Sequence, residues 1–297
     1  MRPAGRGDLE SLYFDYPFFE APKRCEVEHL RSVAIVGAGP IGMVTALTLA
    51  RHGIKSILLE AKSTFNDGSR AICVSRSSFH ILDSLGLVDP FLEKSLGWTK
   101  GRSFYRGKKI LEFDMPDDSN QKFRPMYNLE QQYIEAFLWQ AVESSDLIEA
   151  RWQSEVVGLK QETKQVELRV KDCAGSYDLP AQWVVAADGA RSTIRKLSGL
   201  RLKGENYEGR YVIADVQMDH DYPTIRRALF DPLSRRGGTV LIHRQPENIW
   251  RIDYQLRDDE SAEEATREEK VRASVSAVLE EIGHEGDWGL EWWSVYS

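Results

Sequence analysis

Short apolar runs alternate with amphipathic segments over the first part of the chain. Residues 32–36 (SVAIV) form an apolar run that enters a glycine turn, which predicts a buried strand. Residues 40–52 carry apolar side chains at helical spacing, and Gly53 follows them as a residue that commonly ends helices. The run KSILLE at 55–60 predicts a second strand. These segments indicate a β-α-β unit, with which a doubly wound parallel sheet opens.

The same patterning predicts further helices and strands in the middle of the chain. Two segments carry apolar residues at helical spacing, at 75–87 and 128–144. A hairpin is expected at 103–114, two antiparallel strands at 155–172, and a further strand within 177–189.

From Gly209 onward the pattern changes to β segments separated by turns, which indicates a second sheet. Residues 261–282 then predict one helix. Ser261 and Glu264 have the spacing of a capping box at its start. The end of the chain is an aromatic, strand-like run whose tryptophans would require burial.

These patterns divide the chain into three parts. Residues 1–30 read as an extended N-terminal arm, residues 31–205 as a dinucleotide-binding domain, and residues 206–297 as a second domain built on a β-sheet. The expected fold class is therefore α/β, with a Rossmann-like domain that carries inserted β-strands and a separate β-sheet domain.

Composition and charge exclude several classes of function. The chain has 297 residues with a formal net charge of −7, so it has no overall basic surface that would bind nucleic acid. No apolar run approaches the roughly 20 residues needed to span a bilayer. The three cysteines, Cys25, Cys73 and Cys173, are widely spaced and show no metal-ligand pattern. A protein of the reducing cytoplasm without a metal site fits these features best.

Three glycines, Gly37, Gly39 and Gly42, form a G-x-G-x-x-G motif between the first strand and the first helix. The first permits a tight turn, the second lets the backbone approach a pyrophosphate, and the third lets helix and strand pack closely. Glu60 ends the second strand, where a carboxylate accepts from ribose hydroxyls. A carboxylate there disfavours a 2′-phosphate, so the predicted ligand is FAD or NAD rather than NADP.

A second motif, WVVAADGARSTIRK, lies at 183–196. Gly189 allows a sharp turn at the carboxyl end of a strand, where open α/β sheets bind their ligands. Asp188 has two interpretations: it accepts from a ligand hydroxyl, or it bonds only to the backbone at the start of the following helix. Ser192 is placed to cap that helix.

The two motifs, together with the segments 68–87 and 127–138, resemble the FAD-dependent aromatic hydroxylases. These are single-component flavoprotein monooxygenases of the p-hydroxybenzoate hydroxylase type, and the 3-(3-hydroxyphenyl)propionate hydroxylase-like members look nearest. The resemblance runs from about residue 18 to the end of the chain. It makes FAD the expected cofactor and residues 31–205 the FAD-binding domain.

The resemblance also implies roles for residues between the motifs. Arg70 would contact the FAD pyrophosphate, and Gln131, with Gln132 as the alternative, would bond the ribityl chain or flavin edge. Asp188 and Gly189 would serve both flavin and nicotinamide binding. For each glutamine, an ordinary place on a helix surface is an equally good interpretation.

The implied activity is hydroxylation of a phenolic or aromatic substrate with dioxygen and NADH or NADPH. Substrate contacts would come from the second sheet, where His243, Arg244, Arg251 and Tyr254 are candidates, although strand alternation would equally place each of them in solvent. The sequence names no catalytic base. It also leaves open which phenol is bound, which nicotinamide is the donor, and whether a homo-oligomer forms.

A third family motif, of the form G-D-A-A-H, does not occur in the sequence. The chain therefore reads as the front part of a longer family member. Two alternatives to the monooxygenase remain at this point. One is an FAD-dependent oxidoreductase without oxygen insertion, and the other is a truncated flavin-binding protein without turnover.

Overall fold

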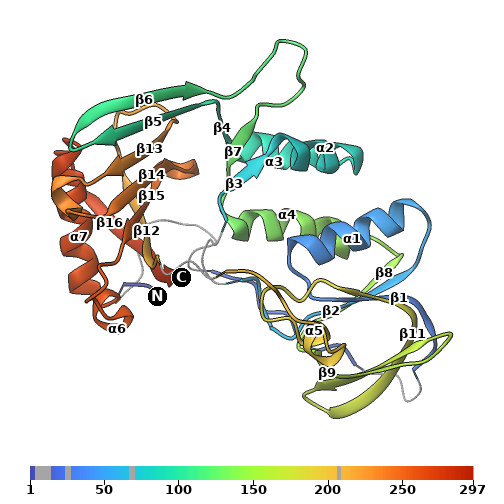
Figure 1. The fold of residues 1–297 in the computed structure, drawn as a ribbon. Helices are drawn as coiled ribbons and strands as arrows, with labels where there is room; N and C mark the ends of the chain where they lie inside the picture. Colours follow the sequence, from blue (N-terminus) through green and yellow to red (C-terminus); the bar gives the residue numbers. More distant parts are fainter. Residues whose placement is uncertain (4–14, 24–27, 67–70, 206–208, 297) are drawn as a thin grey trace.

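The computed structural model describes residues 1–3, 15–23, 28–66, 71–205 and 209–296. In this part of the chain, two large sheets lie on either side of a small three-stranded sheet (Figure 1). No helix among the described residues is long and apolar enough to cross a membrane.

The first large sheet contains the predicted β-α-β unit. Its parallel part has the order β8-β2-β1-β11, and two antiparallel strands, β10 and β9, extend it beyond β11. The strands are β1 (Arg31–Val36), β2 (Ser56–Leu59), β8 (Ile148–Arg151), β9 (Glu155–Gln161), β10 (Val166–Asp172) and β11 (Gly175–Ala186).

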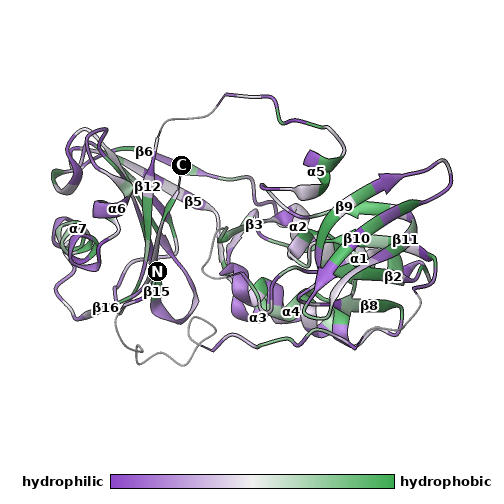
Figure 2. Cartoon of the chain, turned by 90° about the horizontal axis from the view of Figure 1, so that it is seen from below, coloured by the Kyte–Doolittle hydropathy of each residue, from purple (hydrophilic) through white to green (hydrophobic). Residues whose placement is uncertain are grey.

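Apolar residues cover both faces of this sheet. The helices α1 (Pro40–Arg51) and α4 (Gln131–Glu143) pack on one face. On the other face, side chains of β9, β10 and β11 and of the short helix α5 (Thr193–Leu197) close a second core over β1 and β2. In Figure 2 the hydrophobic colour runs through β2. The predicted Rossmann-like arrangement is confirmed.

The second large sheet has seven strands in the order β16-β12-β15-β14-β13-β5-β6. They are β5 (Lys100–Tyr105), β6 (Lys108–Asp114), β12 (Tyr211–Met218), β13 (Arg226–Phe230), β14 (Thr239–Arg244), β15 (Ile249–Gln255) and β16 (Trp288–Tyr296). One face packs on α7 (Glu268–Glu281) and forms an apolar core, into which Trp293 is buried. The burial expected for the terminal tryptophans therefore holds for Trp292 and Trp293.

The hairpin β5–β6 belongs to this second sheet, although the sequence division places it within residues 31–205. β5 pairs in parallel with β13, from Gly101 beside Arg226 to Tyr105 beside Phe230. The hairpin pattern is local and was visible in the sequence. The pairing joins segments more than 100 residues apart and has no local signal.

The predicted helix over 261–282 forms as two helices, α6 (Ala262–Ala265) and α7. Ser261 caps α6 through a hydrogen bond from the Glu264 amide, as expected. The helix breaks at Arg267, which has extended backbone angles. The Trp293 indole donates to the Thr266 carbonyl at 2.7 Å, so β16 binds a carbonyl at the break.

The small sheet has the order β3-β7-β4 and connects the two halves of the molecule (Figure 1). Its strands are β3 (Cys73–Ser75), β4 (Leu96–Trp98) and β7 (Met126–Asn128), with helices α2 (Arg76–Ser84) and α3 (Val88–Lys94) between β3 and β4.

One buried amide fixes this connection. Asn128 Oδ1 accepts from the Trp98 indole at 2.8 Å and from the Cys73 thiol at 3.4 Å. Asn128 Nδ2 donates to the Arg244 carbonyl at 2.7 Å, at the end of β14. A single side chain thus joins all three strands of the small sheet to the large one.

The described residues of the N-terminal arm form no helix or strand. Phe19 stacks on Trp152 with ring centroids 4.2 Å apart, and the Phe19 carbonyl accepts from Gln153 Nε2. Met1 exchanges two backbone hydrogen bonds with Trp293 of β16. The arm therefore contacts both large sheets.

Candidate functional site

The two motifs meet at the carboxyl ends of β1 and β11. The Ala187 amide donates to the Val36 carbonyl at 2.8 Å, and the Gly37 amide donates to the Leu59 carbonyl at 2.7 Å. A side chain at Gly37, whose φ is +103°, would place its Cβ 2.5 Å from the Ala187 carbonyl oxygen. Only glycine permits this contact, so the two turns form one surface.

The other two glycines have different surroundings. A Cβ at Gly42 would lie 1.8 Å from the Gly37 carbonyl oxygen, so this glycine lets α1 approach the turn closely. A Cβ at Gly39 would meet no atom within 4 Å. Gly39 precedes α1, Pro40 occupies the first turn, and no side chain caps this helix end. Open space in front of an uncapped helix N-terminus suits an anionic group such as a pyrophosphate.

Glu60 lies directly beside this turn. Its carboxylate accepts from the Ala38 amide at 2.8 Å and from the Lys62 amide at 3.0 Å. These bonds hold the carboxylate at the end of β2, and its remaining lone pairs can accept from hydroxyl groups. The geometry fits the ribose contact predicted for this residue.

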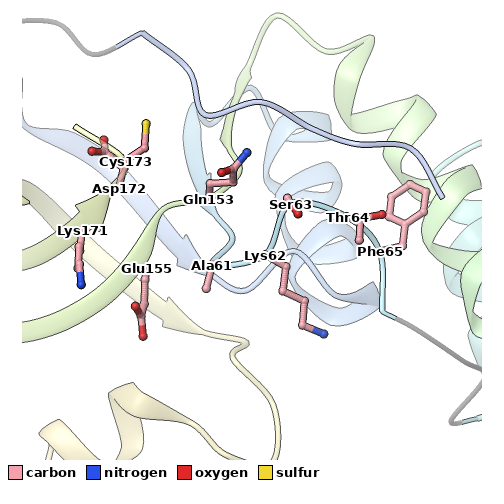
Figure 3. A pocket seen from close by; sticks show the side chains of 10 residues that line it. All are labelled: Ala61, Lys62, Ser63, Thr64, Phe65, Gln153, Glu155, Lys171, Asp172 and Cys173. Atoms are coloured by element: carbon pink, nitrogen blue, oxygen red, sulfur yellow. The ribbon is translucent and has the colours of Figure 1, made fainter. Parts of the chain in front are cut away.

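A pocket of about 610 Å³ opens next to Glu60 (Figure 3). It is lined by residues 61–65 after β2, by Gln153 and Glu155 before and at the start of β9, and by residues 171–173 at the end of β10. Its mixed lining, with Phe65 and Ala61 beside polar side chains, can accept a flat ring that also forms hydrogen bonds.

The Asp188 turn contains the backbone hydrogen bond that one of the two interpretations predicts. Asp188 Oδ2 accepts from the Ile194 amide at 3.0 Å, which is the backbone bond expected of an aspartate at a helix start. Ser192 Oγ accepts from the Arg195 amide at 2.9 Å, so Ser192 caps α5 as predicted. Gly189 has φ +75°, which the sharp turn requires. A ligand role for Asp188 and Gly189 stays a prediction.

The two glutamines at the start of α4 have different environments. Gln131 Nε2 donates to Glu135 Oε1 at 2.7 Å. Gln132 is fully buried, and neither atom of its amide has a hydrogen-bond partner among the described residues. Neither glutamine is thereby assigned to the cofactor. The predicted pyrophosphate contact, Arg70, lies outside the described residues.

The second sheet turns a polar face toward the nucleotide-binding half. Asp215, Arg251 and His243 are direct cross-strand neighbours on β12, β15 and β14. The Arg251 guanidinium donates to both oxygens of Asp215, at 2.8 and 2.7 Å. Gln245 Nε2 donates to the same carboxylate at 2.9 Å. All four side chains are buried.

The four substrate candidates on this sheet separate by face. His243 and Arg251 belong to the polar face. Tyr254 lies on the opposite face, in the core with α7. Arg244 donates to the Tyr222 carbonyl at 3.3 Å and lies over the Trp250 ring. Strand alternation explains the difference, because Arg251 and Tyr254 are an odd number of positions apart.

Two acidic residues at this face were missed by the sequence analysis. Asp253 follows Arg251 by two positions on β15 and so shares its face, a signal that alternation could have provided. Glu130 precedes α4, is fully buried, and neither of its carboxyl oxygens has a partner among the described residues. The sequence gives no sign of that burial, because it depends on the packing of α4 beside the second sheet.

Burial changes the protonation of these groups. Desolvation raises the pKa of Glu130 to about 8, with the neighbouring Asp215 adding to the effect. Desolvation also raises the pKa of Asp253 to about 7, although Arg251 opposes it. For His243, desolvation and the charges of Arg226 and Arg251 lower the pKa to about 3. At neutral pH the histidine is therefore uncharged and Glu130 is mostly protonated.

Comparison with known proteins identifies the family. The sequence pattern of a family described as "FAD binding domain" matches residues 31–292. The chain belongs to this family. The resemblance to the FAD-dependent aromatic hydroxylases is thus confirmed, and FAD is the cofactor of the fold.

Characterised family members are similar over most of this chain. A para-nitrophenol 4-monooxygenase of Pseudomonas sp. (strain WBC-3) is 29% identical over 77% of the chain and 57% of that protein. A 3-(3-hydroxy-phenyl)propionate/3-hydroxycinnamic acid hydroxylase of Mycolicibacterium smegmatis is 26% identical over 80% of the chain and 42% of that protein. The chain thus spans about half the length of these relatives.

Solved structures of other proteins have the same fold. The p-nitrophenol 4-monooxygenase PnpA from Pseudomonas putida DLL-E4 superposes with a TM-score of 0.78 at 24% identity, covering 91% of this chain and 68% of that one. The flavin-dependent monooxygenase PieE also gives a TM-score of 0.78, at 20% identity, covering 91% of this chain and 50% of that one.

The glycine turn predicts opposite results for two matched substitutions. Gly42→Ala should lower the free energy of unfolding by about 1–3 kcal/mol, because its Cβ would overlap the Gly37 carbonyl. Gly39→Ala should leave the stability of the apoprotein within about 0.5 kcal/mol but weaken FAD binding, because the methyl group enters the space in front of α1. Urea unfolding and flavin titration measure the two effects. Equal loss of stability in both variants would contradict this account.

The raised pKa of Glu130 predicts a pH-dependent stability. Between pH 4.5 and about 8 the folded protein retains a proton that the unfolded chain releases, so this contribution to stability is lost as pH rises through that range. Glu130→Gln removes this pH-dependent loss of stability. The variant should gain stability relative to the parent as pH increases from 5 to 8.5, as measured by urea midpoints. Glu143→Gln, at an exposed position at the end of the same helix, is the control. A pH-independent difference for Glu130→Gln would show that its proton is not involved.

Proposed function

We propose that the protein is an FAD-dependent aromatic monooxygenase that hydroxylates a phenolic substrate with dioxygen and NADH or NADPH. The observation that carries the proposal is the contact between the Gly37 and Asp188 turns, which forms a dinucleotide-binding surface in the half that faces the polar side of the second sheet. The activities of the similar proteins, a nitrophenol monooxygenase and hydroxyphenylpropionate hydroxylases, support this activity.

The residues present fit FAD. The N-terminus of α1 beyond Gly39 would hold the pyrophosphate, and Glu60 would accept from the ribose. The pocket beside Glu60 would accept the adenine ring. Arg70, Gln131, Asp188 and Gly189 would complete the contacts to the pyrophosphate, ribityl chain and nicotinamide. When bound, FAD supplies the redox chemistry and the activation of dioxygen.

The protein's own contribution is to hold an aromatic ring in a dry, polar space. The Arg251–Asp215 pair is held by two hydrogen bonds across paired strands, so it is preorganised before a substrate binds. The neutral imidazole of His243 comes from the neighbouring strand, β14. Burial of this face excludes water from the groups that orient the ring. The Asn128 bonds keep the two halves together across the small sheet.

The proposal is tested with the 297-residue chain reconstituted with FAD. A phenol should stimulate the oxidation of NADH or NADPH, and labelled oxygen from O₂ should appear in the hydroxylated product. Glu60→Gln should retain less FAD, because it removes the charged acceptor beside the glycine turn. Glu162→Gln, on an exposed hairpin, is the matched control.

Four outcomes separate the alternatives. Labelled product supports the monooxygenase. Substrate oxidation without labelled oxygen would favour an FAD-dependent oxidoreductase instead. A chain that binds FAD but never turns over would be a flavin-binding protein, and one that binds no FAD would contradict the cofactor assignment.

A further inference from the structure

The polar face of the second sheet contains more acids than available cations. Asp215, Asp253 and Glu130 all bring carboxyl groups to it, and the charges of Asp215 and Arg251 act on both of the other acids. Arg251 is the buried cation among them. Its guanidinium is already engaged with both oxygens of Asp215. Among the described residues at the buried end of this face, the Nε–Nη2 fork of Arg251 is therefore occupied and is not open to a second carboxylate.

Several hydrogen-bonding atoms on the face have no partner in the described part of the chain, among them both carboxyl oxygens of Glu130 and Oε1 of Gln245. Two more lie side by side on neighbouring strands. They are the buried Oδ1 of Asp253 and the buried Nδ1 of His243. The strand register makes the two residues diagonal neighbours, because His243 lies opposite Arg251 and Asp253 follows Arg251 by two positions. Buried polar atoms without partners are uncommon in proteins and point to a bound group that satisfies them.

The charges that face Asp253 come from several strands. Arg251 and Asp215 lie on β15 and β12, and Arg226 begins β13. Arg226 is exposed, so it can meet a charged group only at the open side of the face. At the buried side, a ligand carboxylate would lose its hydration next to Asp253 and Asp215 without gaining a cation. A hydroxyl group, in contrast, brings one donor and no charge.

We propose that the substrate enters this face with an uncharged phenolic hydroxyl that donates to Asp253, and that the same face excludes aromatic carboxylates at its buried end. The proposal rests on the proposed function, since it names the class of ring that the site selects. Asp253 acts as a specificity-determining residue. The Nδ1 atom of the uncharged His243 imidazole lies on the same face. It provides a second hydrogen-bonding group for the substituents of the ring.

Two probe ligands with the same methyl-substituted ring test this selectivity: 4-methylphenol, which is neutral at pH 7.5, and 4-methylbenzoate, which is charged. Equilibrium dialysis with the FAD-reconstituted chain gives the affinity of each. The parent protein should bind the phenol at least about tenfold more tightly than the benzoate, since only the hydroxyl satisfies a charged acceptor.

Asp253→Asn should abolish most of this preference. The phenol should bind about tenfold more weakly, because its acceptor is no longer charged, while the benzoate should bind no more weakly than before. Asp253→Glu keeps a carboxylate and should restore part of the preference. Asp259→Asn, in the exposed segment after β15, should leave both affinities unchanged. Circular dichroism and flavin content verify that each variant is folded.

The selectivity is overturned if the parent protein binds the benzoate as tightly as the phenol, or binds neither. It is also overturned if a folded Asp253→Asn variant keeps the full preference. The comparison in the parent protein needs no substitution, so it decides the matter even if a variant fails to fold. Failure of the proposed function looks different: the FAD-reconstituted chain would then discriminate the two ligands but give no product labelled from O₂.

Discussion

The parallel pairing of β1 with β11 is the contact on which the rest of the site depends. It brings the Gly37 turn against the Asp188 turn, although about 150 residues separate them, and the fit is so close that the first position allows no side chain. The pairing also fixes where α1 begins and therefore where its uncapped amides point. The position of Glu60 beside the Gly37 turn follows from the same geometry, because β2 pairs with the other edge of β1.

A second constraint is the cost of burying polar groups between the two halves. The polar face of the second sheet is covered because the small sheet and the start of α4 lie beside it. Within this interface, Arg251 and Asp215 satisfy one another, whereas Glu130 and Gln132 do not find partners among the described residues. Unpaired buried groups lower stability, and at this interface a bound ligand would supply the missing bonds.

The features that were predicted correctly from the sequence are those that depend on local signals. The G-x-G-x-x-G turn, the acid at Glu60 and the Ser192 cap were all found, because each depends on residues close together in the chain. The sequence did not predict that β5 joins the second sheet or that the helix after Ser261 breaks at Arg267. The first depends on pairing with a distant strand. The second coincides with a hydrogen bond from the Trp293 indole of β16 to the Thr266 carbonyl. Asp253 was missed although its spacing from Arg251 placed it on the same face.

The Asn128 side chain has a mechanical consequence. Its bonds run from β3 and β4 through β7 to the end of β14, so they cross the junction between the two halves at one buried point. A hinge motion that separated the halves there would have to break the Asn128–Arg244 bond inside the protein, where water is slow to replace it. The junction between the two halves is therefore rigid at Asn128. Any widening that admits a ring or releases a product has to occur on the sides of the interface away from β7.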